Sequence, residues 1–203
     1  MIQVTVGIKK NTIIAFEDAF HGDTFGAMAV SGIGLFTEAF QEALIKVIRI
    51  PVPTKGNEAI SKLALEKAIA ENEVAAFIFE PLVLGAAGMV MYEALELDKL
   101  LSVCKEKGVF TIADEVMTSR HGRSGMMQLL GVEADITTFG KYIGGGFSFG
   151  AFGGKAEFLD QFDTSPESGR ASPIAHGGTF NNNLSTMTAG CAVLGEVFTA
   201  DVA

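Results

Sequence analysis

Two stretches predict the fold of this 203-residue chain: Thr111-Ile112-Ala113-Asp114-Glu115-Val116 and Thr138-Phe139-Gly140-Lys141-Tyr142-Ile143-Gly144-Gly145-Gly146. Each begins with residues that favour a buried strand, and a charged residue follows that run. Ligands of open α/β sheets bind outside the carboxyl ends of the strands. We therefore expect Asp114 and Lys141 at the same rim of a sheet, either as a structural salt bridge or as parts of a ligand site.

Apolar runs that alternate with helical patterns extend this prediction outward from the two stretches. We expect strands at 12–16, 47–50, 75–79, 109–113, 135–139 and 148–153, and helices at 58–71, 95–107, 155–162 and 184–198. Such alternation predicts a three-layer α/β fold, with a mostly parallel sheet and helices on both faces. With no internal repeat or linker, residues 1–203 are expected to form a single domain.

Local signals predict several helix boundaries and one buried helix face. Asn57 is expected to cap the 58–71 helix, and Asn182 or Asn183 the last helix, while Gly108 is expected to end the second one. Helical spacing in the first of these helices places five residues on one face, namely Ile60, Leu63, Ala64, Lys67 and Ala68.

Composition excludes some classes of partner. The net charge is −9 and no basic run is present, so we expect no nucleic-acid partner. Cys104 and Cys191 lie outside any metal-ligand spacing and are expected to be free thiols. Free thiols, together with the lack of a secretory signal at the start of the sequence, favour a reducing, cytoplasmic location.

The segment 74–92 is almost wholly apolar and long enough to span a bilayer. Glu80 and Pro81 lie near its middle, and Gly85 and Gly88 follow. These residues would break a helix and place a charge in lipid. A buried strand that runs into a turn is the better interpretation, so we expect no contact with a membrane.

The residue types at the rim favour one cofactor. A lysine beside a glycine tract, such as Lys141, suits Schiff-base formation. Asp114 could hold a positive charge on a ligand ring, and Phe20 offers an aromatic face. These contributions fit pyridoxal 5′-phosphate. Phosphate-loop, catalytic-triad and zinc-site spacings are absent, so we expect no metal.

Six motifs occur in a fixed order: Phe20-His21-Gly22, Glu80-Pro81, Asp114-Glu115-Val116-Met117-Thr118, Thr138-Phe139-Gly140-Lys141, Gly150-Ala151-Phe152-Gly153-Gly154 and Gly178-Thr179-Phe180-Asn181. Together they resemble the class III aminotransferases of the fold-type I pyridoxal-phosphate enzymes, in particular the glutamate-1-semialdehyde aminomutase-like members. The resemblance covers residues 12–200.

The resemblance implies a role for each of four residues around the cofactor ring. Lys141 is expected to form the internal aldimine and to shuttle the proton, and Asp114 to keep the ring nitrogen protonated. Val116 and Phe20 would pack on the two faces of the ring. As an alternative, Phe20 and Val116 are core residues, which would be expected even without a cofactor.

Further residues at the predicted site have less specific roles. The resemblance implies that Glu80 is an active-site acid and that Thr179 reaches the phosphate of a partner's cofactor in a homodimer. His21 is expected in the cofactor-binding set, or as a support of its turn. Glu115 is expected to be a structural hydrogen-bonding partner, and His176 a solvated surface residue.

The implied function is amino-group transfer between a small-molecule amino donor and a keto or aldehyde acceptor, as a transaminase or an aminomutase. Racemisation or decarboxylation with the same lysine and aspartate is a weaker alternative. Another is a truncated, inactive relative that acts as a binding or dimerisation module. The family's N-terminal segment and C-terminal small domain are expected to be absent from residues 1–203.

Overall fold

The computed structural model describes residues 10–169 and 173–202, which form two compact units. The N-terminal unit comprises residues 10–114. The C-terminal unit comprises residues 115–169 and 173–202. The single-domain organisation expected from the sequence stays a prediction.

Four parallel strands form the centre of the N-terminal unit. They are β1 (Thr12–Phe16), β2 (Val47–Ile50), β3 (Val74–Phe79) and β6 (Phe110–Asp114), and their order is β2-β1-β3-β6. Three consecutive residues of β1, Ile14 to Phe16, are fully buried, so the strand is covered on both faces. The α/β fold with a mostly parallel sheet is confirmed.

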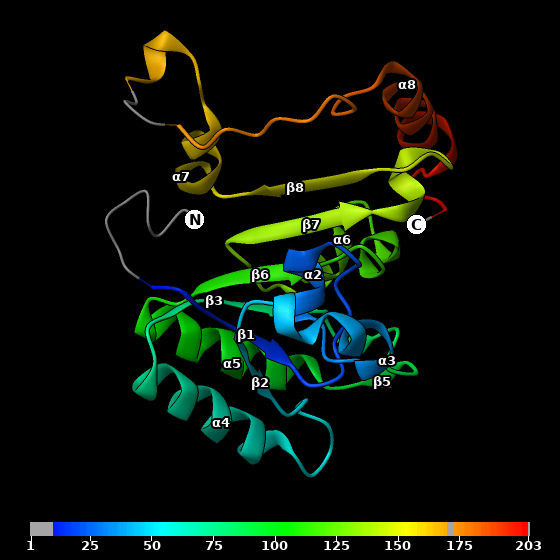
Figure 1. Ribbon diagram of the computed structural model, residues 1–203. Helices are drawn as coiled ribbons and strands as arrows, with labels where there is room; N and C mark the ends of the chain where they lie inside the picture. The colour runs from blue at the N-terminus through cyan, green and yellow to red at the C-terminus, as the bar shows by residue number, and fades with distance from the viewer. Residues whose placement is uncertain (1–9, 170–172, 203) are drawn as a thin grey trace. The chain divides into compact units, whose positions relative to one another are not determined.

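Two long helices, α4 (Glu58–Glu71) and α5 (Ala94–Lys107), pack beside each other. Figure 1 shows them along one face of the strands. As predicted, Gly108 ends α5, with a left-handed backbone at φ 62°. The short helix α2 (Phe25–Val30) begins after β1, and the Thr24 hydroxyl caps it by accepting the N–H of Ala27.

The buried face of α4 differs from the predicted one. Ile60 and Leu63 are 55% and 67% exposed, whereas Ser61, Leu65 and Ala68 are buried. Apolar residues occur all around this helix, so their spacing alone does not identify the side that packs. Asn57 occupies the N-cap position of α4, as predicted, but its side chain makes no capping bond.

Several short elements were not expected from the sequence. They are the helices α3 (Gly34–Thr37) and η1 (Glu38–Ala43), and a hairpin of β4 (Val83–Leu84) with β5 (Val90–Met91). Strands of two residues are too short to show an alternating pattern, so they leave no periodic signal.

Aromatic side chains form the centre of the core in the N-terminal unit. Phe16 and Phe77 pack edge to face at 5.2 Å, and Phe77 stacks on Phe79 at 5.4 Å. All three are fully buried. Burial of a phenylalanine side chain contributes about 1.5–3 kcal/mol, so this cluster is a main stabiliser of the strands that carry the site.

The C-terminal unit is built on an antiparallel pair, β7 (Ile136–Gly140) with β8 (Gly150–Gly154). Helix α8 (Leu184–Ala192) packs against the η3 turn (Lys141–Gly144) that follows β7, as Figure 1 shows. Asn183 caps α8 by accepting the N–H of Thr186, which confirms a predicted cap.

Short helices complete this unit. They are η2 (Thr118–His121), α6 (Gly125–Leu130), α7 (Ala156–Leu159), η4 (Asp160–Phe162), η5 (Pro166–Ser168) and the π-helical turn η6 (Val193–Val197).

 Helix α7 begins one residue after β8, with Lys155 at its N-cap position. The single helix predicted over 155–162 is divided between α7 and η4. Within the described residues, no helix combines the length and the apolarity needed to cross a membrane.

Candidate active site

Three neighbouring strands of the N-terminal unit bring four predicted site residues together. Phe20 and His21 follow β1, Glu80 directly follows β3, and Asp114 is the last residue of β6. Because β1, β3 and β6 are adjacent and parallel, their carboxyl ends lie at one edge of the sheet.

The imidazole of His21 is paired with the carboxylate of Asp114. His21 Nδ1 lies 2.7 Å from Asp114 Oδ2, and the two side chains are 2% and 8% exposed. An ionised carboxylate only accepts, so Nδ1 carries the proton and donates it. The other ring nitrogen, Nε2, is buried with no hydrogen-bond partner in the described structure. His21 therefore orients Asp114, a role that the turn motif alone did not reveal.

The carboxylate of Glu80 fixes the chain on both sides of the site. It accepts the backbone N–H of Phe20 and that of Gly85, each at 3.0 Å. Burial raises the pKa of Glu80, and the two N–H donors partly oppose this rise. Glu80 thus lies in the predicted site, where it holds the turn that presents Phe20.

Two residues that support the site were missed from the sequence. Ser31, which is fully buried, accepts the N–H of His21 at 2.9 Å. The hydroxyl of Tyr92 donates to the Glu80 carbonyl at 2.7 Å, and burial raises the Tyr92 pKa. Ser31 ends a short helix and Tyr92 follows a two-residue strand, so neither carries a sequence signal for this role.

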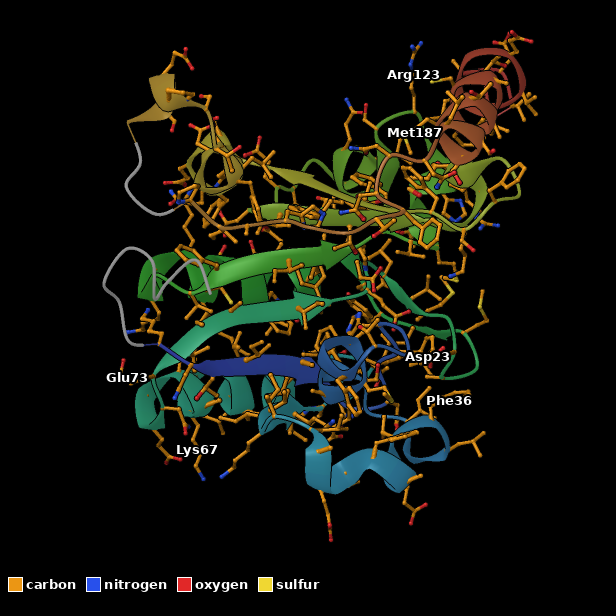
Figure 2. All side chains as sticks on the ribbon, turned by 45° about the horizontal axis from the view of Figure 1, so that its top comes forward. Asp23, Phe36, Lys67, Glu73, Arg123 and Met187 are labelled. Atoms are coloured by element: carbon orange, nitrogen blue, oxygen red, sulfur yellow. The ribbon has the colours of Figure 1, made fainter. Side chains whose placement is uncertain are left out.

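The ring of Phe20 lies half-buried beside another aromatic ring. Its centroid is 5.1 Å from that of Phe36, at a tilt of 58°. Figure 2 shows Phe36 and Asp23 at one end of the unit, and Lys67 and Glu73 at the other. Since Glu73 directly precedes β3, the end with Phe36 is the carboxyl end of the strands.

In the C-terminal unit, Lys141 directly follows β7 in an unusual backbone conformation. Its φ is 54°, in the left-handed region that non-glycine residues rarely adopt, and the residue is exposed. A Cβ on Gly140 would lie 3.4 Å from Cγ1 of Val116 and 3.3 Å from the Phe149 carbonyl oxygen. Val116 therefore packs against the backbone that leads into Lys141. Backbone strain of the kind seen at Lys141 is common at functional sites.

The segment before α8 carries the remaining candidates. Thr179 is exposed in the turn that precedes the helix. His176 is also exposed, although its ring lies edge-on to Phe152 at 5.6 Å. A groove of about 730 Å³ is lined by His176, by Asn183 and by Met187, which Figure 2 labels on α8.

The family assignment follows from a match along almost the whole chain. The model of the aminotransferase class-III family matches residues 2–203. The chain belongs to the class-III aminotransferase family. The resemblance expected from the ordered motifs is thereby confirmed.

Members of this family with different reactions resemble the chain. It is 45% identical over 131 residues to a beta-phenylalanine transaminase of Variovorax paradoxus, which covers 64% of this chain and 29% of that protein. It is 35% identical over 195 residues to a glutamate-1-semialdehyde 2,1-aminomutase of Ignicoccus hospitalis, which covers 93% and 44%.

Solved structures of the family have the same fold. A beta-phenylalanine aminotransferase from Variovorax paradoxus superposes with a TM-score of 0.78 at 33% identity, over 99% of this chain and 42% of that one. An amine transaminase from an uncultivated Pseudomonas species, solved with pyridoxal phosphate bound, superposes with a TM-score of 0.81 at 27% identity. The match covers 95% of this chain and 47% of that one. The fold-type I prediction is confirmed, and the chain spans less than half the length of these relatives.

Proposed function

We propose that this chain carries the pyridoxal-phosphate site of an enzyme that moves an amino group from a small-molecule amine to a keto or aldehyde acceptor. One observation carries the proposal furthest. A buried aspartate, Asp114, is held by His21 at the carboxyl ends of parallel strands, where ligands of α/β sheets bind. Family membership supports the choice of cofactor, since class-III aminotransferases depend on pyridoxal phosphate.

The residues of the N-terminal unit fit the ring of this cofactor. A protonated ring nitrogen is a cation that donates a hydrogen bond, and the buried Asp114 carboxylate is the matching acceptor. The bond from His21 Nδ1 fixes the direction of that carboxylate. Phe20, whose backbone is held by Glu80, offers an aromatic face. In our proposal Asp114 keeps the ring nitrogen protonated, and Phe20 stacks on the ring.

Lys141 is the residue that we propose for covalent attachment and for proton transfer. When bound, the cofactor supplies an electron sink for charge that develops at the substrate carbon. The amine Nζ of Lys141 would carry the proton from that carbon to the carbon of the cofactor that receives the amino group, and the reverse steps would deliver a proton to the acceptor. The exposed position of Lys141, directly after β7, leaves this amine accessible to ligands. Val116 lies beside Gly140, and we propose that it packs on the ring.

We further propose a homodimer, located in the cytoplasm, in which Thr179 reaches the phosphate of the partner's cofactor. The exposed position of Thr179 in the turn before α8 supports this role. The names of the relatives include a transaminase and an aminomutase. The proposal therefore covers amino-group transfer between molecules and within one.

Covalent trapping tests the assignment of Lys141. The full chain is mixed with pyridoxal phosphate, reduced with borohydride and digested, and the modified peptide is identified by mass spectrometry. We expect the cofactor on Lys141, and its loss in Lys141→Ala. Lys155→Ala is a matched control, because Lys155 lies on the surface in an ion pair with Asp135. Unchanged trapping in Lys141→Ala would refute the assignment.

Turnover separates the enzyme from an inactive binding module. The chain is assayed with amine donors and keto-acid acceptors, and transfer of the amino group is followed by chromatography. Transfer that depends on Lys141 supports the proposal. If the cofactor is trapped on Lys141 but no donor and acceptor pair is converted, the chain is a cofactor-binding module without the activity.

A further inference from the structure

The side chain of Glu115 is buried, yet no role in the cofactor site explains why a carboxylate lies there. It is 1% exposed. Its oxygens accept the backbone N–H groups of Met126 at 2.5 Å and Met127 at 3.1 Å, in the first turn of α6. The Thr118 hydroxyl lies 3.4 Å from Oε2. These donors offset the cost of burying the carboxylate.

The backbone N–H and carbonyl of Glu115 are also hydrogen-bonded. Its N–H donates to the Thr138 carbonyl in β7 at 3.1 Å, and its carbonyl accepts the N–H of Ser119 at 2.9 Å. One residue thus joins β7, the η2 turn and the start of α6. All of these elements belong to the C-terminal unit.

The chain keeps space for this carboxylate. A Cβ on Gly125 would lie 2.5 Å from Glu115 Oε2, so a larger residue at position 125 would displace the carboxylate. Gly125 also has a φ of 81°, which favours glycine. Glycine at position 125 therefore meets both requirements, one of space and one of backbone conformation.

The residue after Glu115 connects this arrangement to the site. Val116 packs against Gly140, whose next residue is Lys141. With its neighbour fixed on both sides by hydrogen bonds, Val116 has little freedom to move away from this contact. We infer that Glu115 is a positioning residue, which seats Val116 against the Gly140–Lys141 backbone and so shapes the cofactor site. This inference rests on the function proposed above.

Replacement of Glu115 by glutamine is the sharpest perturbation. The amide oxygen can accept one of the two N–H groups of α6, but its NH₂ group faces the other donor. A buried N–H donor without an acceptor carries a free-energy penalty, and this penalty corresponds to about a tenfold change in the equilibrium constant between the wild-type and the displaced arrangement. We expect Glu115→Gln to weaken pyridoxal-phosphate binding by about tenfold, through a displaced Val116.

A double-mutant cycle tests whether the effect passes through Val116. The dissociation constant of pyridoxal phosphate is measured by absorbance titration for the wild-type chain, Glu115→Gln, Val116→Ala and the double variant. Coupled residues are non-additive, so Glu115→Gln should have little effect once Val116 is alanine. Equal effects in both backgrounds would overturn the inference. The exposed Glu133→Gln, from the loop after α6, is the matched control and should bind as the wild type does.

Further measurements separate the possible failures. If borohydride traps no cofactor on Lys141 of the wild-type chain, the proposed function fails. If the wild type is trapped and the cycle is additive, only the role of Glu115 fails. Hydrogen exchange without cofactor should show faster exchange at Met126 and Met127 in Glu115→Gln, and unchanged exchange there would also count against the inference. Should Glu115→Gln not fold, Thr118→Val removes the hydroxyl near the carboxylate and enters the same cycle.

Discussion

His21 Nδ1 lies 2.7 Å from Asp114 Oδ2, although the two residues are 93 positions apart in the sequence. The pair brings the turn after β1 to the end of β6, with β3 between these strands. A buried carboxylate held in this way keeps one orientation, as a hydrogen-bonding partner for a cationic ring requires. The turn motif and the strand-end aspartate are therefore two parts of one structure.

Removal of the His21 ring should destabilise the chain. In His21→Ala the buried Asp114 carboxylate loses this donor, and we expect a loss of about 1–3 kcal/mol in the free energy of unfolding. In His21→Asn the amide NH₂ replaces Nδ1 as the donor and should restore part of the lost free energy of unfolding. Urea titration measures both. His121→Ala, at an exposed residue, is the control, and equal stability of His21→Ala and this control would contradict the prediction.

The buried carboxyl of Glu80 predicts a pH dependence of stability. Burial raises its pKa above the ordinary value of 4.5. Between that value and the raised pKa, the folded chain binds more protons at Glu80 than the unfolded chain, so stability falls as the pH rises.

Comparison with Glu80→Gln isolates this contribution, because glutamine does not titrate. The free energy of unfolding of the wild type, minus that of Glu80→Gln, should decrease as the pH rises from 4.5 and level off above the pKa of the folded state. Urea titrations at a series of pH values measure it. A difference that stays constant or increases over this range would show that the pKa is not raised.

Two adjacent glycines test the packing of α8 on the turn after Lys141. Gly145 and Gly146 both have positive φ, at 62° and 91°. A Cβ on Gly145 would lie 2.6 Å from the Ala189 carbonyl carbon and oxygen, whereas a Cβ on Gly146 would meet nothing within 4 Å.

Alanine at either position adds backbone strain, but only Gly145→Ala forces α8 away. We expect Gly146→Ala to cost about 1 kcal/mol of stability, and Gly145→Ala about 1–3 kcal/mol more. Thermal unfolding followed by circular dichroism compares them. A similar loss of stability in the two variants would show that α8 moves away from position 145 without a loss of free energy.

Two leucines of α4 form a matched pair for the core. Leu65 is fully buried and Leu63 is 67% exposed. Leu65→Ala should lower the free energy of unfolding by about 2–5 kcal/mol, because it leaves a cavity. Leu63→Ala should change it by no more than about 0.5 kcal/mol. Urea titration measures both changes. A larger loss of free energy of unfolding for Leu63→Ala than for Leu65→Ala would favour the buried face predicted from the sequence.

The predictions from sequence succeeded where the signal is local. Long apolar runs and helical periods placed β1, β2, α4 and α5 within a residue of their observed bounds, and Asn183 was recognised as a cap. They failed where packing decides. The buried side of α4 and the β4–β5 hairpin depend on neighbours that are distant in the sequence.

The sequence by itself determined the class of fold and the residues that the site offers. Periodicity depends only on residues a few positions apart, and the ordered motifs around Asp114 and Lys141 name a family without any coordinates. Tertiary structure alone decided that His21 pairs with Asp114 and that Glu115 faces the amides of α6. These contacts join residues from separate elements, and their geometry depends on how the chain packs, which local sequence signals do not encode.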